Sequence, residues 1–148
     1  MALAQAWLAE RPSASTAVIG SSLGGFYATV LAERHGCRAV LLNPAVEPAR
    51  DLAAHIGELT AWHSDDRFFF RAEFVDELGS MKPVAVTSPE RYLAVIAKGD
   101  EVLDWREMAA RYAGCSLVLL EGCDHALTGY EHTLLPMVMR FLGLDAAS

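Results

Sequence analysis

Four short apolar runs, separated by turn residues and by helix-forming segments, constrain the fold of this chain most strongly. Each run has five or six residues and is apolar almost throughout, which is typical of a strand buried on both faces. The alternation of such strands with helices predicts an α/β fold, with a mostly parallel sheet and helices on both faces. The runs occupy residues 16–20, 38–42, 92–97 and 116–120, and the helical patterns between them include residues 25–35 and 105–112.

The segments around these runs carry weaker patterns. Residues 3–10 predict a short amphipathic helix, and residues 48–56 predict a short helix. Residues 57–90 show little periodicity, so we expect this segment to be irregular or to contain short helices. In a last helix, Pro136 either kinks the helix or stands in its first turn. The apolar face of that helix carries Leu134, Val138, Phe141 and Leu142.

Composition narrows the class of protein. A chain of 148 residues, 53% of them hydrophobic, is long enough for one core, so we expect residues 1–148 to form a single domain. The net charge of −7, without a cluster of Lys or Arg, argues against a nucleic-acid partner. No apolar stretch reaches the roughly 18 residues of a membrane span, and no signal peptide is evident. The three cysteines lie far apart and predict neither a disulfide framework nor a metal site, so we expect a reducing cytoplasm.

The first predicted strand passes into a helix through the sequence Gly-Ser-Ser-Leu-Gly, residues 20–24, which matches the pattern G-x-S-x-G. This pattern places a serine, here Ser22, on a tight strained turn above a sheet. We expect Gly20 and Gly24 to be required, because a side chain at either position would collide with the neighbouring strand or helix. The helix that follows favours negative charge near the N–H of Leu23. The alternative is an ordinary Gly/Ser turn, and the stretch lacks the lysine of phosphate-binding loops.

An aspartate and a histidine follow the third and fourth predicted strands. Asp100, in "AKGDEVLD", is placed to orient a histidine, and a solvated turn residue is the alternative. Asp104 is a competing acid, but Asp104-x-x-Glu107 is typical of a helix N-cap, and Glu101 is a weaker candidate. His125, in "EGCDHALTG", lies in a loop from which it can reach over the sheet edge as a general base; an ordinary surface histidine is the alternative. We expect the neighbouring aspartate to cap this loop.

The blocks "IGSSLGGFYAT", "LLNPAVEP", "GDEVLDWRE" and "EGCDHALTGYE" together resemble the α/β-hydrolase superfamily, and more narrowly its small YqiA-like esterases. The chain order serine, aspartate, histidine is also the order of that superfamily. The resemblance implies hydrolysis of short acyl esters without a cofactor or a metal ion. It implies Ser22 as nucleophile, Asp100 as acid, His125 as base, Leu23 as an oxyanion donor, and Asn43 beside the oxyanion and substrate as a supporting residue.

The sequence departs from this family at its beginning. Family members start with a strand and a His-Gly loop that supplies the other oxyanion donor, whereas the only His-Gly pair here is His35-Gly36, after the predicted nucleophile strand. We therefore expect an N-terminally shortened α/β-hydrolase sheet with residues 16–20 at its edge. An unpaired edge of this kind favours pairing with another chain, for example in a homo-oligomer.

The leading prediction is a cytoplasmic serine hydrolase that cleaves a small-molecule acyl ester through a Ser-His-Asp triad and an acyl-enzyme, with neither nucleic acid nor membrane as a partner. A thioesterase or acyltransferase with the same triad is one alternative. A non-catalytic hydrolase-like module that binds a partner through the sheet edge is another. Four aromatic residues either wall the acyl pocket or belong to an ordinary core, namely Trp62, Phe68, Phe69 and Phe70.

Overall fold

The computed structural model describes residues 1–53, 56–60 and 67–144, with only the backbone described in the segments 58–60 and 67–70. Its contacts divide the chain into two compact units. The first unit comprises Met1–Val46 and Pro83–Ser148, and the second comprises Glu47–Lys82. The first unit contains the sheet and every candidate site residue.

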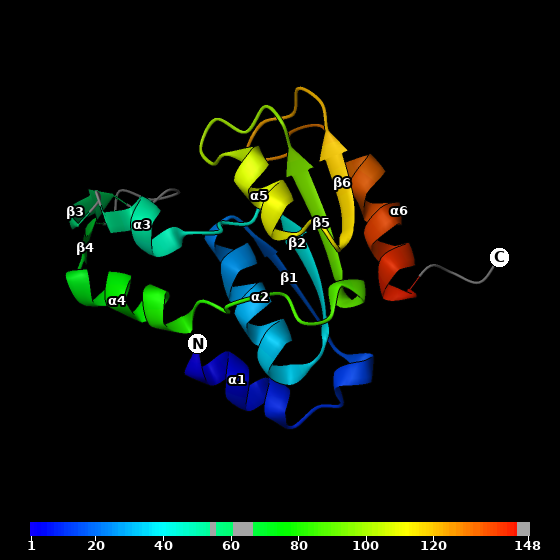
Figure 1. The fold of residues 1–148 in the computed structure, drawn as a ribbon, viewed down its shortest axis with the longest axis horizontal. Helices are drawn as coiled ribbons and strands as arrows, with labels where there is room; N and C mark the ends of the chain where they lie inside the picture. Colours follow the sequence, from blue (N-terminus) through cyan, green and yellow to red (C-terminus); the bar gives the residue numbers. More distant parts are fainter. Residues whose placement is uncertain (54–55, 61–66, 145–148) are drawn as a thin grey trace. The chain divides into compact units, whose positions relative to one another are not determined.

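The first unit is built on a four-stranded parallel sheet with the order β1-β2-β5-β6 (Figure 1). Three of these strands have the bounds that the sequence predicts, and β1 lies one residue later than predicted. The predicted α/β class with a parallel sheet is therefore confirmed. The strands are β1 (Ala17–Ser21), β2 (Arg38–Leu42), β5 (Tyr92–Ala97) and β6 (Ser116–Leu120).

Helices cover both faces of this sheet, as predicted. On one face, α2 (Leu23–His35) and α5 (Trp105–Arg111) form a core with alternate residues of β2 and β5. On the other face, α6 (Glu131–Leu142) forms a second core with the intervening residues of the same strands. Since successive strand residues point to opposite faces, covering both faces explains why β2 is apolar after Arg38 and why β5 is apolar throughout. The first core includes Ala28, Ala32, Leu41, Ile96, Met108 and Tyr112, and the second includes Val40, Leu93, Val95, Leu120 and Leu134.

Local signals in the sequence set one end each of α2 and α5. The helix α1 (Ala2–Ala9) begins the chain, and short 3₁₀ turns occupy Ser13–Ser15 and Pro89–Arg91. Gly36 ends α2 in the left-handed conformation, with φ 71°. Asp104 caps α5 as predicted, because its carboxylate accepts the Arg106 N–H at 2.9 Å. Pro136 lies inside α6 rather than in its first turn.

The strand β1 forms one edge of the described sheet, which confirms the edge position expected for the strand before Ser22. Alternate residues of β1 are exposed, and 58% of Ile19 is accessible to solvent. The five residues of this strand carry no charge and no proline, which are the usual means of protecting an edge.

The second unit corrects the expectation for residues 57–90. Instead of irregular or purely helical structure, it contains an antiparallel pair of strands between two helices. Glu47 and Lys82, at the two ends of this unit, form an ion pair. Trp62 lies outside the described residues, as do the side chains of residues 68–70, so the aromatic pocket wall stays a prediction. The elements are α3 (Pro48–Ala53), β3 (Gly57–Thr60), β4 (Arg67–Phe70) and α4 (Ala72–Met81).

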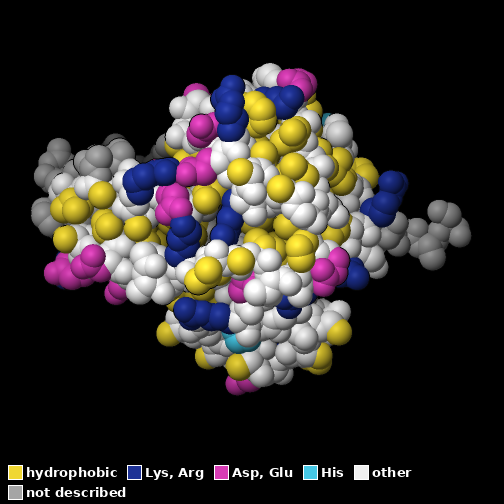
Figure 2. All heavy atoms as spheres, viewed as in Figure 1, with side chains coloured by type: hydrophobic (Ala, Val, Ile, Leu, Met, Phe, Trp, Pro, Cys, Tyr) yellow, Lys and Arg dark blue, Asp and Glu magenta, His cyan; other side chains and the backbone are white. Residues whose placement is uncertain are grey.

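The surface drawn in Figure 2 is mixed, with Lys and Arg side chains scattered among acidic and apolar ones. The longest helix in the described part of the chain, α2, has 13 residues. None of the described helices has both the length and the apolar character to cross a membrane, for which about 20 residues are needed.

Candidate active site

The carboxyl ends of the four parallel strands lie together at one end of the sheet, and a candidate residue follows each strand there. Ser22 follows β1, Asn43 follows β2, Asp100 lies in the turn after β5, and His125 lies in the loop after β6. Parallel pairing therefore gathers residues that are widely separated in the sequence. Their contacts decide what the arrangement can do.

Ser22 occupies a strained turn between β1 and α2. Its φ of 53° and ψ of −124° lie in a region that favours glycine, and the residue is also the N-cap of α2. The Ser22 N–H donates to the Leu42 carbonyl oxygen at 3.0 Å, and the Ser22 carbonyl accepts from the Ala45 N–H at 2.9 Å. Both backbone groups of the serine are thus tied to the end of β2 and the turn after it, which holds the strained conformation.

The turn requires two glycines, but not the two that the motif predicts. A Cβ atom at Gly20 would lie 2.1 Å from the Gly24 carbonyl oxygen, so Gly20 is required as expected. A Cβ atom at Gly24 would meet nothing within 4 Å, so the collision expected there is wrong. The close approach falls instead on Gly25, where a Cβ atom would lie 2.7 Å from Cβ of Pro44. Gly25 is buried in the first helical turn, whereas Gly24 faces solvent.

Leu23 is the first residue of α2, so its N–H has no acceptor within the helix. The N–H groups of a first turn carry the positive end of the helix dipole. The Leu23 N–H therefore offers a donor for a negatively charged oxygen beside Ser22.

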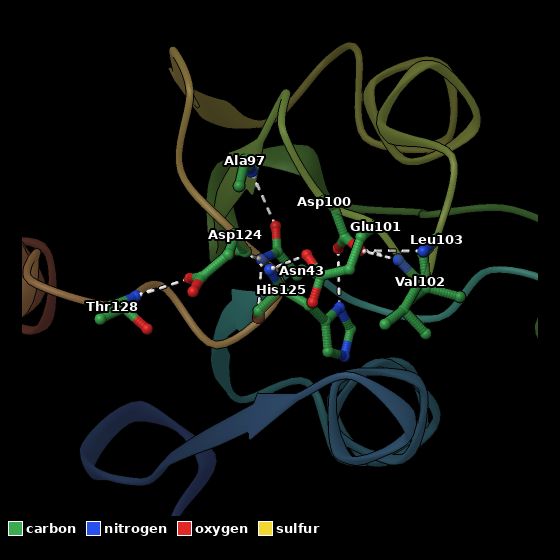
Figure 3. Close-up of polar contacts among 9 residues, drawn as sticks. All are labelled: Asn43, Ala97, Asp100, Glu101, Val102, Leu103, Asp124, His125 and Thr128. Carbon is green, nitrogen blue, oxygen red and sulfur yellow. Dashed lines mark hydrogen bonds and ion pairs between the residues drawn. The ribbon is translucent and has the colours of Figure 1, made fainter.

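Asp100 and His125 form a direct pair, with Oδ2 of the aspartate 2.7 Å from Nδ1 of the imidazole (Figure 3). The other carboxylate oxygen, Oδ1, accepts the N–H groups of Val102 and Leu103, both at 2.8 Å. The Asp100 side chain is fully buried, and 15% of the His125 side chain is exposed. One carboxylate oxygen therefore organises the turn and the other orients the histidine, whereas the alternative of a solvated turn residue does not describe this buried side chain.

The pairing sets the tautomer of the imidazole. A carboxylate oxygen accepts, so Nδ1 of His125 carries the proton, and Nε2 keeps its lone pair in the neutral ring. In Figure 3 the ring extends from Asp100 with its far nitrogen directed away from the carboxylate. Among the described residues no hydrogen bond joins Ser22 to this ring, and catalytic hydrogen bonds of this kind often tighten only with substrate bound.

The backbone of His125 is held by two further side chains (Figure 3). Glu101 accepts the His125 N–H at 3.0 Å through Oε2. Asn43 donates through Nδ2 to the carbonyl oxygens of His125 at 2.9 Å and Asp124 at 3.3 Å. Asn43 is fully buried, and its Oδ1 accepts the Ala97 N–H at 2.7 Å. The family resemblance placed Asn43 near the site, but nothing local in the sequence indicated the contact of Glu101 with this loop.

Asp124 caps the histidine loop, as predicted. Its Oδ1 accepts the Thr128 N–H at 2.8 Å, and this hydrogen bond from the Thr128 backbone lowers the pKa of the Asp124 carboxyl group. The Asp124 carbonyl accepts the Leu127 N–H at 3.1 Å, where Leu127 has a φ of 60° and is buried. The loop is therefore a tight hydrogen-bonded turn that buries a leucine beside the histidine.

A cavity of about 240 Å³ adjoins both loops. Ser21 and Ala126, which line it, are the sequence neighbours of Ser22 and His125. Most of its other lining is apolar, and Glu131 is the one acidic residue among the lining residues. The apolar lining comes from the end of β2, the histidine loop and α6, namely Leu42, Leu127, Leu134, Leu135 and Val138.

The sequence profile of the uncharacterised protein family UPF0227 matches residues 2–142 of this chain. Among solved structures, Est1E from Butyrivibrio proteoclasticus is similar, with a TM-score of 0.62 and 21% identity over 84% of this chain and 58% of Est1E. A monoacylglycerol lipase from Paleococcus ferrophilus has a TM-score of 0.68 and 13% identity, over 95% of this chain and 72% of the lipase. The mouse α/β hydrolase domain-containing protein 10 has a TM-score of 0.60 and 18% identity, over 88% of this chain and 62% of that protein.

These similarities confirm the predicted α/β-hydrolase fold and the resemblance on which it rested. At such low identity they show the fold alone. The chain spans less than two thirds of the length of Est1E. The name of the monoacylglycerol lipase states an activity, and that activity belongs to the lipase.

Proposed function

This chain belongs to the uncharacterised protein family UPF0227, and from its fold and site we propose that it is a serine hydrolase of short acyl esters. The observation that carries the proposal is the contact of the buried Asp100 carboxylate with Nδ1 of His125. This pair lies at the carboxyl ends of the strands, where the strained Ser22 also lies. A carboxylate on Nδ1 orients the imidazole and stabilises the imidazolium that forms when a general base accepts a proton.

In the proposed reaction, Ser22 Oγ attacks the ester carbonyl carbon while Nε2 of His125 takes the hydroxyl proton. Asp100 holds the ring and stabilises the imidazolium that forms. The tetrahedral intermediate collapses as the C–O bond to the alcohol breaks and His125 returns the proton to the leaving oxygen. Water, activated by the same histidine, then hydrolyses the acyl-enzyme and restores Ser22.

We assign the Leu23 N–H as one donor to the oxyanion, because it lies at the helix N-terminus directly after the serine. The Asn43 amide group supports the site differently. Both of its N–H bonds face carbonyl oxygens of the histidine loop, so we assign Asn43 to supporting that loop.

The cavity beside Ser21 and Ala126 supports an apolar acyl group as the substrate moiety next to the serine. Its volume of about 240 Å³ is below the roughly 300–1,000 Å³ of pockets that enclose drug-sized ligands. A short, neutral acyl chain is therefore the group that fits, and the Glu131 carboxylate disfavours an anionic one.

The test is hydrolysis of a short-chain p-nitrophenyl ester by the chain and by the Ser22→Ala variant, with fluorophosphonate labelling of both. Turnover and labelling that are lost only in the variant support the proposal. Comparison of acyl-CoA with simple esters separates an esterase from a thioesterase or acyltransferase. Folded dimers without any turnover would favour the second candidate, a binding module that pairs through β1, for which the exposure of Ile19 at the sheet edge is the motivating observation.

A further inference from the structure

We propose that Asn43 and Glu101 are positioning residues that hold the peptide groups on either side of the His125 Cα atom and so set the place of its imidazole. The inference rests on the proposed function for its catalytic consequence, but its geometric content does not. His125 is held at three points, the ring by Asp100, the N–H by Glu101 and the carbonyl oxygen by Asn43.

Asn43 is a buried residue whose contacts link the turn that holds Ser22 to the loop that holds His125. Both polar atoms of its side chain form hydrogen bonds to other segments. Oδ1 accepts the Ala97 N–H at the end of β5, and Nδ2 donates to carbonyl oxygens of the loop after β6. Its φ of 42° is a strained value for a residue with a side chain, although asparagine tolerates it better than most. Asn43 is therefore held in a strained conformation by contacts with several elements at once.

The same residue is bracketed by the contacts of the serine. Leu42, directly before Asn43, accepts the Ser22 N–H, and Ala45, two residues after it, donates to the Ser22 carbonyl oxygen. The backbones of Ser22 and His125 are therefore both hydrogen-bonded to the same short stretch of chain, residues 42–45. A shift of Asn43 relative to the histidine loop changes the distance between nucleophile and base.

Glu101 holds the opposite side of the histidine. Its backbone position is set by its neighbour Asp100, so the ring and the N–H of His125 are anchored by adjacent residues of one turn. Unlike Asn43, Glu101 is exposed, and its removal leaves no cavity. It therefore provides a variant in which loss of positioning is separable from loss of folding.

The consequence for catalysis lies in the turnover step. Substrate binding does not require the loop carbonyl and N–H to be held, whereas proton transfer requires Nε2 to face Ser22 Oγ. A misplacement of about 1 Å can cost up to about 10²-fold in rate. We expect Glu101→Ala to lower kcat by about tenfold or more with KM nearly unchanged, and Glu101→Gln, which keeps an acceptor oxygen, to restore most of it.

The experiment compares Glu101→Ala, Glu101→Gln and Asn43→Asp with the unaltered chain and with Glu121→Ala, a control that removes an exposed carboxylate after β6. Asn43→Asp keeps the acceptor toward Ala97 but replaces the two donors with an oxygen. Each protein is measured for kcat, KM, thermal unfolding and the low-field proton resonance of Nδ1–H on His125. The resonance should be sharp in the unaltered chain, Glu101→Gln and Glu121→Ala, and broadened or lost in Glu101→Ala and Asn43→Asp.

The outcomes separate the two proposals. If the unaltered chain is active and Glu101→Ala keeps both its kcat and its resonance, the positioning inference is overturned while the proposed function stands. If Ser22-dependent turnover is absent, the proposed function fails, and the resonance alone decides the inference. A purely structural role for both residues would lower the unfolding temperature without moving the resonance of the folded variants, and that result also overturns it.

Discussion

Oδ2 of Asp100 lies 2.7 Å from Nδ1 of His125, and the two residues belong to the loops after neighbouring strands, β5 and β6. The aspartate is fully buried, and its second oxygen accepts two backbone N–H groups, whereas the histidine keeps some exposure to solvent. The position of the carboxylate is therefore set by backbone N–H groups and by burial, and the carboxylate in turn orients the imidazole ring. This order of dependence motivates the first prediction.

Replacing Asp100 with Asn should lower kcat by about 10⁴-fold with little change in folding. The Asn carbonyl can still accept the N–H groups of Val102 and Leu103, but the amide N–H then faces the imidazole and selects the tautomer whose Nε2 carries a proton. Steady-state kinetics with an ester substrate measures the effect. Asp104→Asn is the matched control, because Asp104 caps α5 and Asn is an equally good cap. Equal losses in the two variants would contradict the assignment of Asp100.

Substitutions of the three glycines around the turn should differ sharply in stability. Gly20→Ala and Gly25→Ala should destabilise the fold strongly, since each Cβ atom would lie less than 3 Å from neighbouring backbone or proline atoms. Gly24→Ala should leave the free energy of unfolding unchanged or raise it by up to about 1 kcal/mol. The alanine Cβ atom would have no atom within 4 Å to collide with, and alanine favours a helix. Thermal unfolding ranks the three variants. A loss at Gly24 comparable to that at Gly20 would show that the motif, rather than the observed packing, describes the constraint.

Replacing Ser22 with Gly should make the chain more stable while abolishing turnover. A non-glycine residue in a sparsely populated backbone conformation costs about 1–3 kcal/mol, and glycine adopts the φ of 53° freely. After the entropic cost of glycine in the unfolded chain, we expect a net gain of about 1 kcal/mol over Ser22→Ala. Urea unfolding of the two variants tests this. An equal or lower midpoint for Ser22→Gly would mean that the turn stores no strain.

Filling the cavity beside the site should shorten the acyl chain that the enzyme accepts. Leu135 lines this cavity and is 62% exposed, so Leu135→Trp narrows it without disturbing the core. Relative to the acetyl ester, kcat/KM for a hexanoyl ester should fall by about tenfold or more. Leu144→Trp, at a residue that is 59% exposed and lies outside this cavity, is the control. A chain-length profile that is the same in both variants would place the acyl group elsewhere.

The hydrogen bond that caps the histidine loop should appear in the pH dependence of stability. The Thr128 N–H lowers the pKa of Asp124 in the folded chain, so its contribution is present above the ordinary aspartate value of 3.8 and is lost as pH falls through the lowered pKa. Asp124→Asn removes this titration while an amide oxygen still accepts the N–H. The difference in unfolding midpoint between the two proteins should therefore shrink below pH 3.8. A difference that is constant across this range would mean that the carboxylate is equally stabilised in the unfolded chain.

Local pattern was enough to predict the sheet, because the physical requirement on each strand is local. Successive residues of β5, and of β2 after Arg38, enter two different cores, so these residues must be apolar, and an apolar run between turn residues indicates this directly. The same reasoning failed for residues 57–90. The strands β3 and β4 have four residues each, and such short strands are defined by pairing with each other rather than by their own sequence. The helix α4 could have been found, since Phe74, Val75 and Leu78 recur at helical spacing and Leu78 is buried.

The order of the elements and the residue types that follow each strand can be predicted from the amino-acid sequence. The three candidate catalytic residues could be selected from local signals. The G-x-S-x-G motif indicates Ser22, and positions after predicted strands together with the chain order indicate Asp100 and His125. Only the tertiary structure shows that Gly25 rather than Gly24 must lack a side chain, that the Asn43 amide donates to the histidine loop, and that Glu101 accepts the His125 N–H. These features depend on approaches between segments that are far apart in the chain, such as Asn43 and His125, 82 residues apart. No local propensity encodes such a distance, because it is set by parallel strand pairing and by the packing of both faces of the sheet.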